Sequence, residues 1–412
     1  MKTTNAAIEK IAPNIHQLTD EQEQLIKRIE KFSKDRINDG HSIFTIYGDC
    51  GTGKSVVLSQ LFFDLQQASH DKKSDLYQTH NYFLVNHPEV LKVYKQIAGA
   101  ENNVLKKNFM RPTSFINQLQ NRDEKADIVI VDEAHLLLSQ PDHYNNFYGH
   151  NQLEEIIKLS KIVLVVFDMR QVIQTKNYWD QHRLDQILKP YYHESYHLTH
   201  QFRMTAKSDL VHWVDEFSNG KLLPIPADAD DGYDFRIYDS AEAMRQEIVK
   251  RNQQVGLSRI VSTTGYPSTL DGGKHYIEER GGFKMPWDQY NYTSTPWAEI
   301  PKSIDEVGSI YTCQGFDLNY VGLILGPPIY LDPKDNRIKV DLSKQTNTES
   351  IKKRKDIADP QAFLRMQRQI ILNSVNVLMK RGVYGTYIYA HDPLLRETLL
   401  KSFAHIKKNP DN

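Results

Sequence analysis

Two short segments constrain what this chain can fold into more strongly than any other feature. Residues 48–55 (GDCGTGKS) fit the pattern G-x-x-x-x-G-K-[ST], and residues 128–135 (IVIVDEAH) form an apolar run that ends in two carboxylates. A β-rich run at 42–47 precedes the glycine segment, and a helical pattern at 55–67 follows it. This strand–loop–helix order is the context that a phosphate-binding loop requires. The acidic segment predicts the end of a second strand in the same sheet.

The glycine segment has the composition of a cradle for a phosphate chain. Small residues let backbone amides surround the anion, and the positive end of the following helix points at it. The residues expected to contribute such contacts are Gly48, Gly51, Thr52 and Gly53. Lys54 is expected to neutralise the β- and γ-phosphate oxygens, and Ser55 to bind Mg²⁺.

The acidic segment predicts hydrolysis of the bound nucleotide. Asp132 is expected to hold Mg²⁺, directly or through water, while Glu133 orients and deprotonates the attacking water. His135 either couples the site to another domain or caps the next helix, and the sequence leaves both open. A P-loop alone does not exclude a kinase, although this base suits water as the nucleophile better. A GTPase is disfavoured because no N-K-x-D segment is present.

Composition limits the partners and the compartment. The chain has 412 residues, is 40% hydrophobic and carries a formal net charge of −1, so a nucleic-acid partner needs a local basic groove. Two cysteines, Cys50 and Cys313, predict neither disulfides nor a zinc site and fit a reducing cytoplasm. No run of apolar residues is long enough to predict a membrane span, and the first residues lack the apolar core of a secretory signal.

Strand and helix patterns alternate along the chain, which predicts an α/β fold. Strand-like runs lie at 82–85, 127–131 and 162–167, and a second series lies at 235–238, 259–263, 321–325 and 386–389. Helical patterns lie at 18–35, 152–159, 241–251 and 362–379. We therefore expect two α/β units with mainly parallel sheets, at 1–195 and 196–412, the second with an insertion at about 327–360.

The order of several further segments resembles superfamily 1 helicases. LTDEQ at 18–22 is similar to the Q motif, in which the glutamine, here Gln22, reads adenine. The glycine and acidic segments resemble motifs I and II, and FDMRQ at 167–171 resembles motif III, which carries over Asp168 and Gln171. LTHQFR at 198–203 resembles motif IV, and its arginine is Arg203.

The remaining motifs make the resemblance more specific than superfamily 1 as a whole. YTCQGFD at 311–317 is similar to motif V, with Gln314, Gly315 and Asp317, and LMKRG at 378–382 is similar to motif VI, with Arg381. Local combinations such as LTHQFRM, SIYTCQGFDLNYVGLILG and KRGVYGTYIYAHD resemble Schlafen-type (Schlafen group 3) helicase domains. The pattern departs from superfamily 1 at Lys380, where Thr is usual, and at Asp317, where Glu is usual.

The resemblance implies two RecA-like units with a nucleotide cleft between them. It further implies that Arg203 and Arg381 face the γ-phosphate, where guanidinium groups stabilise developing charge. ATP and Mg²⁺ are the implied cofactors. A superfamily 2 DEAH-box enzyme is disfavoured, because its S-A-T motif and its Q-R-x-G-R-x-G-R ending are missing.

Two functions stay in competition. The first is ATP hydrolysis coupled to binding or translocation along single-stranded DNA or RNA, possible contacts being Asn86-His87, Tyr178, Trp179, Trp287, Lys106-Lys107 and Lys352–Lys355. The second is an ATP-driven conformational switch in a defence-related protein assembly, with nucleic acid only as a trigger. Either reading leaves room for a protein partner that supplies a nuclease, wedge or targeting function.

Overall fold

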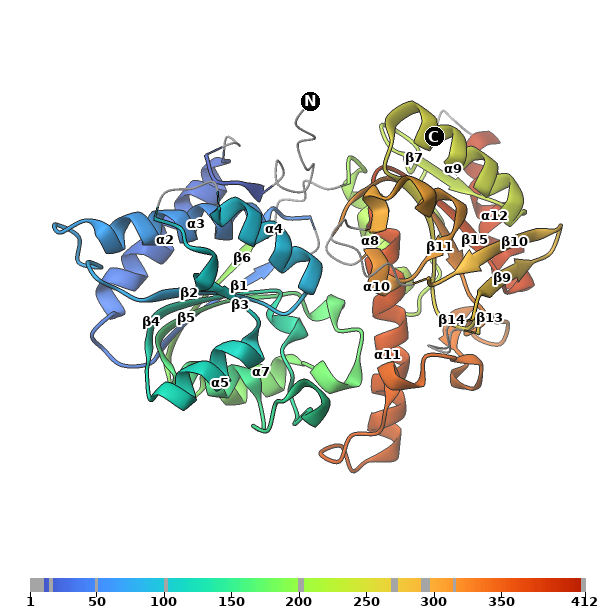
Figure 1. Ribbon diagram of the computed structural model, residues 1–412. Helices are drawn as coiled ribbons and strands as arrows, with labels where there is room; N and C mark the ends of the chain where they lie inside the picture. Colours follow the sequence, from blue (N-terminus) through green and yellow to red (C-terminus); the bar gives the residue numbers. More distant parts are fainter. Residues whose placement is uncertain are drawn as a thin grey trace. The chain divides into compact units, whose positions relative to one another are not determined.

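The computed structural model describes residues 11–14, 18–48, 51–99, 103–198, 204–267, 273–289, 297–313 and 316–408. The chain divides into two compact units. Unit 1 comprises Met1–Val172 and Lys176–Gln201, and unit 2 comprises Ile173–Thr175 and Phe202–Asn412. Each unit has its own sheet and its own hydrophobic core (Figure 1).

Unit 1 is built on a six-stranded parallel sheet with the strand order β3-β2-β4-β5-β1-β6. Its strands are β1 (Ser42–Gly48), β2 (Asn81–Val85), β3 (Phe109–Met110), β4 (Ala126–Asp132), β5 (Ser160–Phe167) and β6 (Tyr192–Leu198). The central strands β4 and β5 are nearly continuous apolar runs that are buried on both faces, as parallel strands covered by helices must be.

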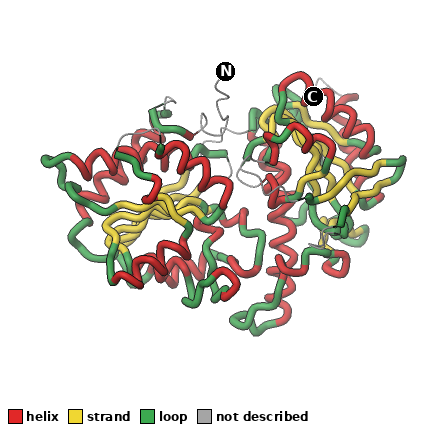
Figure 2. Tube along the Cα trace, viewed as in Figure 1, coloured by secondary structure: helices red, strands yellow, loops and turns green. Residues whose placement is uncertain are grey.

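Helices cover both faces of this sheet, so the strands form a middle layer (Figure 2). One face carries α2 (Asp20–Arg36), α3 (Lys54–His70) and α4 (Pro88–Ala98). The opposite face carries α5 (Pro112–Arg122), α6 (Gln152–Lys158) and α7 (Gln181–Leu188). Because all six strands run parallel, their carboxyl ends lie along one edge of the sheet.

Unit 2 contains a seven-stranded sheet with the order β7-β15-β12-β8-β11-β10-β9. It is parallel except for the β9–β10 hairpin. Its strands are β7 (Asp234–Ile237), β8 (Ser258–Ser262), β9 (His275–Glu279), β10 (Phe283–Trp287), β11 (Val307–Gly308), β12 (Leu318–Leu325) and β15 (Gly382–Ala390). Its helices are α8 (Ser208–Ser218), α9 (Ala241–Val255), α10 (Ile310–Cys313), α11 (Pro360–Met379) and α12 (Pro393–Lys408).

The fold class expected from the sequence is confirmed: both units are α/β with mainly parallel sheets. The expected insertion contains a separate hairpin of β13 (Ile329–Asp332) and β14 (Arg337–Val340), which the sequence patterns did not indicate. None of the helices within the described ranges is long and apolar enough to cross a membrane.

Candidate nucleotide site

The glycine segment joins β1 to α3, as its pattern predicts. Gly51 and Gly53 have φ values of 91° and 76°, a left-handed conformation that strains other residues. A Cβ atom on Gly48 would lie 2.7 Å from Thr52 Oγ1, so this position also needs glycine. No side chain caps the first turn of α3, which begins at Lys54. The loop therefore has the compact backbone and the helix end that suit an anion.

Lys54 lies among residues from two strand ends. Its side chain is 6% exposed, and its Nζ donates a hydrogen bond of 2.8 Å to the carbonyl oxygen of Gly48. The same Nζ lies 4.0 Å from Oδ2 of Asp168, which follows β5. Gln171 Nε2 donates to that Asp168 oxygen at 2.8 Å. Since β5 is the neighbour of β1 in the sheet, the fold brings the predicted motif I and motif III residues together.

The two carboxylates after the apolar run stand at the end of β4, the next strand along. Asp132 is buried, and its Oδ1 accepts a 3.0 Å hydrogen bond from the backbone N–H of Glu133. Burial, and after it the Glu133 carboxylate, raises the pKa of Asp132 above its ordinary value. A charge of opposite sign, such as Lys54 or a bound cation, favours the ionised form that a metal ligand needs.

Glu133 is held in an unusual backbone conformation. Its φ of 52° and ψ of 51° place a non-glycine residue in the left-handed region, a conformation found at functional sites more often than elsewhere. Its Oε2 lies 3.4 Å from Nδ1 of His135, which is fully buried in a short 3₁₀ turn at Ala134–Leu136. The local turn thus separates the directions of the two adjacent carboxylates and packs His135 beside Glu133.

Tyr94 is a site residue that the sequence patterns did not indicate. It lies on α4, is buried, and donates a 2.9 Å hydrogen bond from its phenol to Oδ2 of Asp132. The side chain of Ser55 lies near the same phenol. The sequence offers one signal for Tyr94, which is its place in the helix that follows β2. Since β2 is the neighbour of β4 in the sheet, this helix packs near the end of β4.

The predicted Mg²⁺ ligands have chemistry that fits the ion. Ser55 supplies a hydroxyl oxygen and Asp132 a carboxylate oxygen, and hard oxygen ligands are those Mg²⁺ prefers. Asp132 accepts a hydrogen bond from the phenol of Tyr94, and the side chain of Ser55 lies near the same phenol. Mg²⁺ usually keeps several waters and binds through one or two protein groups plus phosphate oxygens, so this small ligand set is sufficient.

Gln22 has a structural role at the start of α2. Its backbone N–H donates to Thr19 Oγ1 at 3.3 Å, and its Oε1 accepts from the Thr19 backbone N–H at 3.1 Å. These reciprocal bonds form a capping box. The side-chain oxygen that would read adenine is therefore already engaged, and adenine recognition by Gln22 stays a prediction.

Arg381 in unit 2 is a buried cation with unused donors. Its guanidinium is 1% exposed, and Nη1 donates a 3.3 Å hydrogen bond to the carbonyl oxygen of Phe316. Among the described residues, its Nε and Nη2 have no hydrogen-bond partner. Asp317, which follows Phe316 in the predicted motif V, is half-buried. Three other predicted residues, Arg203, Gln314 and Gly315, lie outside the described residues.

Several side chains proposed to touch nucleic acid are used for packing. Trp179 and Trp287 are each 2% exposed, and Trp179 Nε1 donates to the carbonyl oxygen of Leu137 at 2.9 Å. Within the basic run, Arg354 is 1% exposed and forms two 2.8 Å bonds with Asp356. Lys352 and Lys353 remain exposed, as do Lys106 and Lys107. The exposed lysines are therefore accessible to phosphate groups, whereas the two tryptophans and Arg354 are buried.

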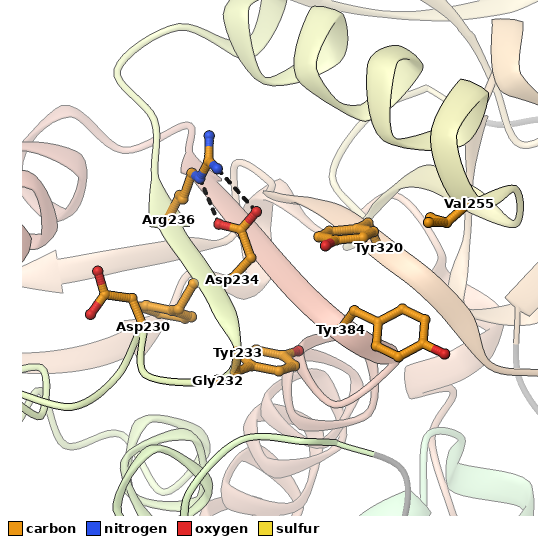
Figure 3. Close-up of a pocket in the computed structure, with 9 residues that line it drawn as sticks. Asp230, Gly232, Tyr233, Asp234, Arg236, Val255, Tyr320 and Tyr384 are labelled. Carbon is orange, nitrogen blue, oxygen red and sulfur yellow. Dashed lines mark hydrogen bonds and ion pairs between the residues drawn. The ribbon is translucent and has the colours of Figure 1, made fainter.

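A hollow of about 790 Å³ opens in unit 2 beside the first residues of β7, β12 and β15 (Figure 3). It is lined by Asp230, Gly232, Tyr233, Asp234, Phe235, Arg236, Val255, Tyr320 and Tyr384. Asp234 accepts hydrogen bonds from Arg236 Nε at 2.6 Å, Arg251 Nη2 at 2.8 Å and the Tyr387 phenol at 2.6 Å. Its central carboxylate is thus engaged by the protein itself.

The fold and the arrangement around Lys54 place the chain among α/β proteins with a glycine-rich P-loop. Residues 41–392 match the Schlafen group 3, DNA/RNA helicase domain, and the chain belongs to this family. It is similar to the uncharacterized protein YPL245W of Saccharomyces cerevisiae, with 41% identity over 414 residues, 93% of this chain and 90% of that protein.

Two solved structures were also matched. The Pif1 helicase from Candida albicans has a TM-score of 0.34 and 13% identity, over 95% of this chain and 99% of that chain. A DNA replication initiation factor has a TM-score of 0.25 and 14% identity, over 44% of this chain and 47% of that chain.

Proposed function

We propose that this chain hydrolyses ATP in the presence of Mg²⁺ and that nucleic acid controls the reaction. The observation that carries the proposal is that Lys54, at the start of α3, lies beside Asp168 at the end of β5, with Asp132 and Glu133 at the end of the adjacent strand β4. One cation, a metal-ligating carboxylate and a base beside a glycine loop are what phosphoryl transfer to water requires.

Each residue has a defined task in this proposal. Lys54 moves from the Gly48 carbonyl to the phosphate oxygens and neutralises their charge. Glu133 accepts the proton of the attacking water, and Gln171, fixed by Asp168, hydrogen bonds near the reacting phosphate. Mg²⁺ would be held by Ser55 and Asp132 and would supply positive charge to neutralise the phosphate oxygens.

Unit 2 contributes positive charge to the same reaction. Arg381 brings a buried guanidinium whose Nε and Nη2 have no hydrogen-bond partner among the described residues, which is the kind of group that stabilises charge on a transferring phosphoryl group. Arg203 has the corresponding role in motif IV. Gln22 reads the adenine base with its remaining amide hydrogens.

The polymer is single-stranded DNA or RNA, by analogy with the name of the family. The exposed lysines at 106–107 and 352–353 supply phosphate contacts. Because the net charge is −1, binding depends on such local groups and weakens strongly as salt concentration rises.

The test is the rate of ATP hydrolysis by the purified chain with and without single- and double-stranded DNA and RNA, with Lys54→Ala as the inactive control. Stimulation by a single-stranded polymer, absent in Lys54→Ala, supports the proposal. A high basal rate that no polymer changes favours an ATP-driven switch within a protein assembly. No hydrolysis under any of these conditions contradicts the proposal.

A further inference from the structure

The phenol of Tyr94 contacts a residue proposed to bind Mg²⁺. It donates a 2.9 Å hydrogen bond to Oδ2 of Asp132, and the side chain of Ser55 lies near the same phenol. Tyr94 is 1% exposed, so water does not compete for the bond to Asp132. This bond ties α4 to the end of β4.

The ring of Tyr94 is fixed by aromatic neighbours and does not depend on these polar contacts for its position. Its centroid lies 4.5 Å from that of Phe83 on β2 and 5.9 Å from that of Phe109 on β3. Such contacts define the rotamer of a buried ring. The phenol therefore presents its hydroxyl to Asp132 from a fixed point.

These contacts determine how Asp132 is oriented. Its Oδ1 accepts the Glu133 backbone N–H at 3.0 Å while its Oδ2 accepts the Tyr94 phenol, so rotation of the carboxylate breaks one bond or both. Each carboxylate oxygen has two lone pairs, which leaves acceptor positions for a cation. Hydrogen bonds that orient a ligating carboxylate are a general means of tuning a metal site.

We propose that Tyr94 is a positioning residue for Mg²⁺, which holds Asp132 in the orientation in which it binds the ion. The inference rests on the proposed function, because it concerns the same metal site. It assigns to α4 a role that no motif in this chain marks. Tyr94 acts only through Asp132.

The experiment compares nucleotide affinity with and without the metal. Fluorescence of mant-labelled AMPPNP, which is not hydrolysed, yields a dissociation constant in EDTA and another in saturating Mg²⁺. Their ratio measures the coupling between metal and nucleotide. Tyr94→Phe keeps the ring and its packing, so the constant in EDTA stays near the wild-type value. The ratio falls by about 10-fold or more, the usual effect of losing an outer-shell partner.

Two comparisons make the result specific. Tyr82→Phe removes a phenol from the neighbouring strand β2, where its ring packs on Phe115, and leaves the ratio unchanged. In an Asp132→Asn background, Tyr94→Phe has little further effect, because the residue it positions is already altered. A reduction of equal size in both backgrounds shows that Tyr94 acts by another route and overturns the inference.

The remaining outcomes separate this inference from the proposed function. If wild-type nucleotide binding gains from Mg²⁺ and Tyr94→Phe preserves the whole gain, the inference alone is wrong. If the wild-type chain binds no nucleotide even in Mg²⁺, the proposed function is overturned and the role of Tyr94 falls with it. If Tyr94→Phe weakens binding equally in EDTA and in Mg²⁺, the phenol supports the loop in general and the metal-specific role is rejected.

Discussion

Lys380 and Asp215 form a partly buried ion pair, with 2.5 Å between Lys380 Nζ and Asp215 Oδ1. Lys380 is fully buried, Asp215 is partly exposed, and Lys380 stands where the helicase pattern usually has threonine. The pair ties the residue before Arg381 to α8. Lys380→Met removes this charge partner of Asp215, and we expect the free energy of unfolding to fall by about 1–3 kcal/mol. Urea denaturation monitored by tryptophan fluorescence measures the change.

The double variant Lys380→Met/Asp215→Leu is the control for this pair. Removing both charges leaves no unpaired buried ion, so most of the lost stability returns. A double variant as unstable as the single one would show that Lys380 acts through its packing and not through its charge.

Because the pKa of Asp64 on α3 is raised, we expect the folded state to lose stability as pH rises. Burial, followed by the Glu30 carboxylate, raises the pKa of Asp64 from 3.8 to about 6. Since the folded-state pKa is the higher one, the side chain favours folding while protonated, and that contribution is lost as pH rises from about 4 to about 6. Asp64→Asn therefore raises the melting temperature at pH 7.5 and has little effect at pH 4. Equal shifts at both pH values would contradict this assignment.

Glu133→Gln tests the proposed base. Gln has the same shape and tolerates the same backbone conformation, so nucleotide binding is retained while the proton acceptor is lost. We expect ATP turnover to fall by about 10²–10⁴-fold, the usual contribution of general base catalysis. Steady-state phosphate release provides the rate, and Glu124→Gln, an exposed carboxylate of the same unit, is the matched control. Normal turnover in Glu133→Gln would exclude Glu133 as the base.

Short-range patterns were enough to predict β1, β4 and β5, because their apolar runs are long and end in recognisable polar residues. The β9–β10 and β13–β14 hairpins were not predicted, because no long apolar run marks their strands. Strand β9 (HYIEE) buries only one residue, Ile277, so no apolar pattern marks it. Its stability comes from pairing with β10, which is a contact that a linear pattern does not show.

The same limit applies to the candidate site. Lys54, Asp132 and Asp168 carry local motifs, and they lie after β1, on β4 and after β5, which are adjacent strands of one sheet. Tyr94 carries none, because its role arises only when α4 packs over the strand next to β4. Gln22 does lie in a recognisable pattern, but that pattern fits two roles. It is the pattern of a capping box and also that of an adenine-reading motif, so the sequence alone does not decide between them.

Arg381 provides the most direct test of whether unit 2 takes part in hydrolysis. Its buried guanidinium uses Nη1 for the Phe316 carbonyl, while Nε and Nη2 have no partner among the described residues. Burying a cation with unused donors is costly, so a residue placed in this way is better explained by an anion that arrives during the reaction. Arg381→Lys keeps the charge but removes the fork of donors.

We expect Arg381→Lys to lower turnover strongly, towards the about 10³–10⁵-fold effect of an arginine that stabilises the transferring phosphate, with nucleotide affinity nearly unchanged. Arg396→Lys is the control, because Arg396 is equally buried in unit 2 and donates to the Ala390 carbonyl at 2.7 Å. Rates and dissociation constants are measured on both variants. A loss of affinity as large as the loss of turnover would mean that Arg381 binds the ground state, and unchanged turnover would remove it from the catalytic machinery.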